Sequence, residues 1–153
     1  MFHEVVEDGR VSGAGVADAD ADEVTPAALR SAFEALLSEA VAEAGRERMR
    51  DETDVDEASI EAAAAGDVSG ISVTDAAAIV AVTADRDADA VVAELRDHLL
   101  MGMATAVLDV DTLAAAIDVD LTGQEVQQAL EGRAGMTVGQ LAEVMAVIER
   151  RKR

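Results

Sequence analysis

Met49-Arg-Asp-Glu-Thr-Asp-Val-Asp56 and Leu113-Ala-Ala-Ala-Ile-Asp-Val-Asp120 are similar stretches that lie 64 positions apart in a chain of 153 residues. The similarity continues downstream, where Gly66 aligns with Gly132 and Ile71-Ser72-Val73 aligns with Met136-Thr137-Val138. The offset is 66 positions at the glycines, which indicates a two-residue insertion around residues 121–123. An internal repeat predicts one helical unit present twice, with chance similarity in an Ala- and Val-rich sequence as the alternative.

Helix signals surround both stretches. Thr25-Pro26 is typical of a helix start, because the hydroxyl caps the first turn and the proline ring presets it. Apolar residues at helical spacing follow as far as Gly45, and a similar series runs from Val91 to Val107. The sequence therefore predicts an all-α fold. Its expected elements are two longer helices at 26–44 and 88–108, short helices at 46–52 and 56–65 separated by a turn at 53–55, and a further helix capped by Ser72.

Three segments are expected along the chain. Residues 1–24 combine glycines with the acidic run Asp18-Ala-Asp-Ala-Asp22 and predict a mobile acidic arm, with a possible short strand at 2–6. Residues 25–85 would form a first helical module. Residues 86–153 would form a second module that ends in the basic tail Arg150-Arg151-Lys152-Arg153.

The charge of the chain is strongly negative. Asp and Glu total 32 against 12 Lys and Arg, for a net charge of -20, yet half of the residues are hydrophobic and Lys152 is the only lysine. Few large apolar groups and many carboxylates indicate a protein of a halophilic archaeon, in which molar salt screens the self-repulsion. An ordinary acidic protein is the alternative.

Other compositional features limit the chemistry. Without cysteine there is no disulfide, thiolate nucleophile or thiolate metal site. The N-terminus lacks a signal-peptide pattern and no run of 18 apolar residues occurs, so we expect a cytoplasmic protein without a membrane span.

The repeated units resemble the helix-turn-helix of the Cro and phage-repressor class. The apolar opening residue, the turn, the aliphatic residue of the second helix and the closing glycine fall on Met49, Asp54-Val55-Asp56, Ile60 and Gly66, and in the second copy on Leu113, Asp118-Val119-Asp120, Val126 and Gly132. Asp54 and Asp118 depart from the usual turn glycine, although Asp tolerates the left-handed conformation. The resemblance, over residues 30–148, implies two tandem helix-turn-helix modules packed through the two longer helices.

A DNA-reading helix needs donors for base edges and cations for phosphates. The first copy offers Glu57 and Glu61 there and should repel DNA. The second copy and the tail supply the predicted DNA-binding residues Gln124, Gln127, Gln128, Arg133, Arg150, Arg151, Lys152 and Arg153. The tail cations have an alternative role, because cations are favoured at a helix C-terminus.

The expected function is a DNA-binding regulator whose second copy reads DNA. The alternative is a protein interaction or adaptor module with degenerate repeats, in partnership with another protein or with itself. The whole chain, including His98-Leu-Leu-Met-Gly-Met103, is also similar to a family of small uncharacterised haloarchaeal proteins, and that resemblance implies no activity.

Catalytic and metal sites are not expected. The spacing Asp18-Asp20-Asp22 matches the start of a calcium loop, but Glu23 and Leu29 stand where its glycine and closing Glu belong. His98 is expected to pack between helices, and Gly13-Ala-Gly15 is too short for a phosphate loop. The sequence predicts no enzyme, no cofactor and no metal.

Overall fold

A computed structural model describes residues 24–117, 120–131 and 135–152 of the chain. These residues form helices α2 to α9 and include no strand, which confirms the all-α class. The bounds are α2 Pro26–Ala44, α3 Arg46–Glu52, α4 Glu57–Ala65, α5 Val73–Ala84, α6 Ala88–Ala106, α7 Val110–Ala116, α8 Gly123–Leu130 and α9 Val138–Arg151. We call residues 24–85 the first half and 86–152 the second half.

Local capping explains the helix boundaries. The hydroxyl oxygen Oγ1 of Thr25 accepts a hydrogen bond from the Ala28 amide at 3.1 Å, and Pro26 opens α2. Gly45 ends α2 with φ at 84°, a conformation that favours glycine. Ser72 caps α5 by accepting from the Asp75 amide at 3.1 Å. The predicted long helix at 88–108 ends two residues earlier, at Ala106.

Val24 is the only residue of the predicted N-terminal arm that belongs to the described part of the chain. Residues 1–23 of the predicted arm, and with them the short strand and the acidic run, lie outside the described residues. Val24 was expected in that arm, and this part of the prediction is wrong, because Val24 is 1% exposed and belongs to the hydrophobic core. It directly precedes the capping Thr25, where an apolar residue covers the first turn of a helix.

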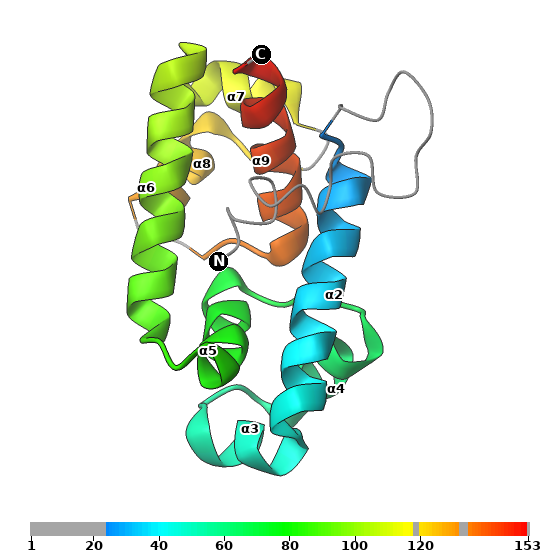
Figure 1. The fold of residues 1–153 in the computed structure, drawn as a ribbon. Coiled ribbons are helices and arrows are strands. Elements are labelled where there is room, and N and C mark those ends of the chain that lie inside the picture. Colours follow the sequence, from blue (N-terminus) through cyan, green and yellow to red (C-terminus); the bar gives the residue numbers. More distant parts are fainter. Residues whose placement is uncertain (1–23, 118–119, 132–134, 153) are drawn as a thin grey trace.

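The helices form a central row flanked on two sides (Figure 1). Helices α5 and α9 lie roughly end to end in the middle, with α2 against both on one side and α6 against both on the other. Helices α3 and α4 cover one end of this body, and α7 and α8 cover the other. One continuous core cluster includes buried residues from every helix, so the two halves share their interior.

The packing follows an approximate twofold pattern. Helix α2 contacts α5 and α9, and α6 contacts α9 and α5 in the same way. An isolated antiparallel bridge joins Ser72 and Thr137. Its hydrogen bonds are reciprocal: the Val73 amide donates to the Met136 carbonyl and the Val138 amide donates to the Ile71 carbonyl, each at 2.8 Å.

Burial follows the same pattern. The buried residues of α2 are Leu29, Phe33, Leu37, Ala40 and Val41, and those of α6 are Val91, Leu95, Leu99, Gly102 and Met103, each 62 positions later. The six buried positions of α5 have buried counterparts in α9 at a constant offset of 65, from Val73 and Val138 onward. Equivalent positions in the two halves therefore face the same interior.

No single described helix is both long and apolar enough to cross a membrane. Helices α6 and α7 reach that length and composition only as a pair bent by 93°.

Candidate functional site

The α7 and α8 pair contains the helix predicted to read DNA. Helix α8 begins with a capping box: Thr122 accepts from the Glu125 amide, and the Glu125 carboxylate accepts from the Thr122 amide, both at 3.1 Å. Val126 and Leu130 are buried and hold α8 against the body. Gly123 lies so close to Asp111 that an added Cβ would collide with the Asp111 carboxylate. The first turn of α8 therefore abuts the first turn of α7.

The three glutamines of α8 differ in availability. Gln124 and Gln127 are exposed, whereas Gln128 is partly buried. The side-chain nitrogen Nε2 of Gln127 donates to the Glu131 carboxylate at 3.0 Å. Gln124, in the first turn, is thus the best-placed donor of the three for an external group.

The basic tail forms the C-terminal end of α9, and Lys152 lies beside Gly102 of α6. Arg150 donates from Nε to the Ala146 carbonyl at 3.3 Å. Arg151 reaches toward α7, where it lines a shallow depression with Asp111 and Thr112. Since Asp111 also touches the start of α8, Arg151 and the first turn of α8 flank the same end of α7. Arg133 and Arg153 lie outside the described residues.

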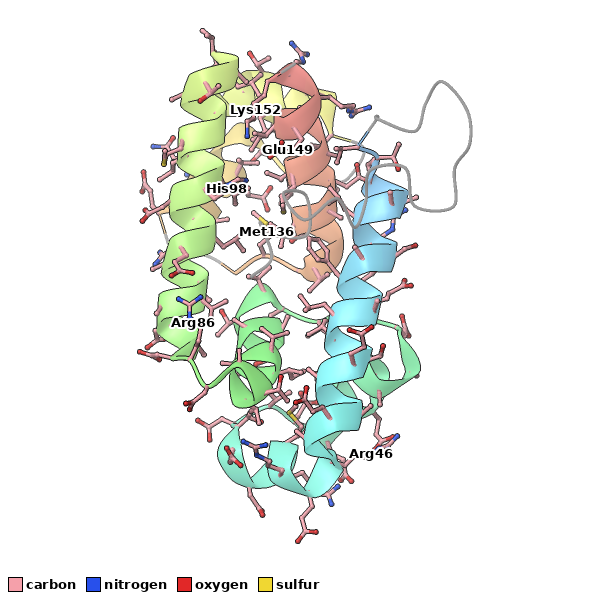
Figure 2. All side chains as sticks on the ribbon, in the orientation of Figure 1. Arg46, Arg86, His98, Met136, Glu149 and Lys152 are labelled. Carbon is pink, nitrogen blue, oxygen red and sulfur yellow. The ribbon has the colours of Figure 1, made fainter. Side chains whose placement is uncertain are left out.

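Lys152 pairs with a carboxylate of α9 rather than with a group of α7. Its Nζ lies 3.3 Å from the Glu149 carboxylate, and the Nε2 of His98 lies 3.3 Å from the same Oε1 atom (Figure 2). Glu149 is 7% exposed and is the one buried charged residue in the described ranges. The His98 hydrogen bond lowers the pKa of Glu149, against the opposing effect of burial.

His98 lies between α6 and α9, as the sequence predicts, but Glu149 was not predicted as its partner. A signal for Glu149 exists in the sequence. It continues the buried series Leu141, Met145 and Ile148 of α9 at helical spacing, so it falls on the inner face. The cluster ties α6 to α9 and keeps one tail cation directed inward.

The first half offers no comparable cationic surface. Its short helices carry three ion pairs: Arg46 with Glu61 at 2.5 Å, Arg48 with Glu52 at 2.6 Å, and Arg50 with Glu57 at 3.3 Å. These pairs involve all three arginines of α3. The carboxylates of two of them, Glu57 and Glu61, belong to α4. Within the described ranges, no cluster of His, Asp or Glu is suited to hold a metal ion.

Comparison with known proteins identifies the family of the chain. No solved structure and no curated protein shows significant similarity to it. A family model described as a family of unknown function, DUF5791, matches residues 29–151, which span all but the first turn of the helical body. The chain belongs to the DUF5791 family of unknown function.

Proposed function

We propose that the chain consists of two helix-turn-helix units and that the second unit reads DNA in a salt-rich cytoplasm. The convergence of Arg151 and the first turn of α8 at one end of α7 carries this proposal. In a helix-turn-helix, the start of the second helix enters the major groove while nearby cations contact phosphates. Gln124 would then contact a base edge, and Arg151 an adjacent phosphate.

The equal spacing of buried positions supports the duplication. The short helices also correspond, because Met49 and Leu113 are fully buried in α3 and α7, and Ile60 and Val126 are fully buried in α4 and α8. These are the apolar positions of the helix-turn-helix resemblance. The first unit would then be structural, since its cations are paired and its α4 face is acidic.

Acidic side chains near α8 set the conditions for binding. Asp111, Asp120 and Glu125 are exposed around the site and oppose phosphate contacts at low salt. Molar salt reduces the Debye length to about 3 Å and so screens this repulsion. Binding under these conditions would depend on fit and base contacts more than on counterion release.

The test is selection from a random-sequence DNA pool in molar KCl, followed by anisotropy measurements on the enriched site. Gln124→Ala should weaken binding about tenfold, the loss of one base contact. Asp120→Asn should tighten binding about two- to fivefold by removing one exposed repulsive charge. The matched control is Asp56→Asn, the aligned position before α4, which should leave the affinity unchanged.

Two results would count against DNA reading by the second unit. One is a pool without any enriched sequence. The other is an equal gain in affinity from Asp56→Asn and Asp120→Asn, which would indicate general charge relief rather than a site at α8.

A second candidate, a protein interaction module, is favoured by the apolar surface at the end of α6. Leu100, Met101 and Val107 are 47%, 71% and 89% exposed. Val107 also has φ at 56°, which is unfavourable for a β-branched residue. Neither its exposure to solvent nor its backbone conformation therefore favours a valine at this position. Asp97 and Asp109 flank this surface, which suits an apolar partner helix bordered by Lys or Arg.

Crosslinking distinguishes this candidate. The wild-type protein should crosslink to one stoichiometric partner through an apolar helix flanked by basic residues. Met101→Glu should abolish these crosslinks. Ala93→Glu, at an exposed position in the first half of α6, should preserve them. Persistence of the crosslinks in Met101→Glu would exclude this surface as the interface.

A further inference from the structure

The two halves differ in how the long helix meets the second short helix. Helix α4 packs extensively along α2, whereas α8 touches α6 over only a short stretch. In the first half, Phe33 of α2 is fully buried. The equivalent residue of α6 in the second half is the smaller Leu95. A smaller side chain and a more distant short helix leave more room in the second half.

A cleft of about 310 Å³ occupies this place. Its walls are mostly apolar and come from the start of α5, from α6, from the end of α8 and from the segment before α9, and they include Val73, Val92, Leu95, Leu99, Leu130 and Met136. Met136 lies between α6 and α9 (Figure 2). The volume is at the low end of the range of about 300–1,000 Å³ for ligand pockets.

One cation, Arg96, also lines the cleft. In the described part of the chain Arg96 makes no ion pair, while Arg30, Arg46, Arg48, Arg50 and Arg86 each pair with a glutamate. Arg151 likewise makes no ion pair in the described residues, but Arg96 differs from it in being partly buried. A partly buried arginine that lines an apolar cleft is well suited to a carboxylate from outside the chain.

We propose that this cleft binds a small aliphatic carboxylic acid, with its chain between Leu95, Leu130 and Met136 and its carboxylate on Arg96. Methionine adapts to chains of varied shape, and the size of the cleft suits a medium-length chain. The proposal goes beyond the proposed function and does not depend on it. Because α6 and α8 both line the cleft, an occupant would also fix the position of α8 relative to α6.

The first test compares octanoate with octanol, by calorimetry and methyl NMR on the intact protein. Octanoate should bind more tightly than octanol, with shifts at Leu95, Leu130 and Met136. Arg96→Gln should weaken octanoate binding about tenfold and leave octanol unchanged, since a charge-assisted hydrogen bond is lost only for the acid. Arg151→Gln, which removes a cation distant from the cleft, serves as the matched control and should bind octanoate normally.

The second test fills the cleft. Leu95→Phe copies the residue found at the equivalent place in α2 and should abolish binding of both probes without lowering Tm. Ala129→Leu fills the same cleft from α8 and provides an independent variant if Leu95→Phe does not fold. Absence of octanoate binding to the wild type, or binding that survives both Arg96→Gln and the filling variants, would overturn the proposal.

Discussion

At the scale of single residues, two helix ends show how local conformation and side-chain type agree or conflict. Asp85 ends α5 and Val107 ends α6, with φ at 55° and 56°. Asp tolerates this left-handed region, whereas valine is strained there because its branched Cβ crowds the backbone. Val107 is also 89% exposed, so packing does not offset the strain.

Val107→Gly should therefore stabilise the protein by about 1 kcal/mol, since the left-handed conformation costs an L-residue about 1–2 kcal/mol and glycine loses part of this gain through chain entropy. Urea unfolding measures the free energy. The matched variant is Asp85→Gly, for which the gain should be smaller. An equal or larger gain at Asp85 would show that the backbone at Val107 is unstrained.

The buried carboxylate of Glu149 predicts a pH dependence. The hydrogen bond with His98 lowers the pKa of Glu149 below its ordinary value of 4.5. A lowered folded-state pKa contributes stability that is fully present above the unfolded value and is lost as the pH falls through the folded value. The stability that Glu149 contributes should therefore decline as the pH falls below about 4.5.

Glu149→Gln should lower the free energy of unfolding by about 1 kcal/mol at neutral pH, because a charge-assisted hydrogen bond becomes a neutral one. This loss should become smaller as the pH falls. The measurement is the free energy of unfolding in urea across this pH range. Glu143→Gln, at a more exposed carboxylate of α9 that pairs with Arg30, corrects for general charge relief. A pH-independent difference between wild type and Glu149→Gln would contradict the assignment.

At the scale of helices, close contact of α6 with α9 depends on one glycine. A Cβ added to Gly102 would lie 2.6 Å from Cγ2 of Ile148, so the helices would have to separate. Gly102→Ala should cost about 1 kcal/mol net, since overpacking costs about 1–3 kcal/mol and helix propensity returns about 1. In an Ile148→Ala background, which removes Cγ2, the same change should become stabilising. Stabilisation by Gly102→Ala in the wild type would contradict the close contact.

Helix boundaries could be predicted from the sequence, and helix partners could not. Thr25-Pro26, Gly45 and Ser72 are local signals, and the structure has helix ends at each of them. The bridge between Ser72 and Thr137 joins residues 65 positions apart, and no local signal specifies such a pairing. The cleft was also missed, because it results from how far α8 lies from α6, which depends on packing rather than on helical periodicity.

At the scale of the whole molecule, each half completes the core of the other. Helix α9 packs on α2 of the first half, and α5 packs on α6 of the second. The sequence predicts residues 25–85 and 86–153 as two modules packed through the two longer helices, and that division remains a prediction. The shared core indicates that they fold together.

Either half produced alone should lack a cooperative unfolding transition, because its central helix loses a long partner helix. Circular dichroism would measure helicity and the transition for each half, cut between α5 and α6, and for the two halves mixed. Mixing should restore the helicity. A sharp independent transition in an isolated half would contradict the shared core.

We propose that the second unit reads DNA while the first supports it. Amide NMR shifts of the intact protein, measured on addition of the selected DNA in molar KCl, test this proposal. DNA reading by the second unit predicts shift changes in the first turn of α8, at Gln124, and at Arg151, with none in α4. Equal changes in α4 and α8, changes confined to Leu100–Val107, or no changes would contradict it.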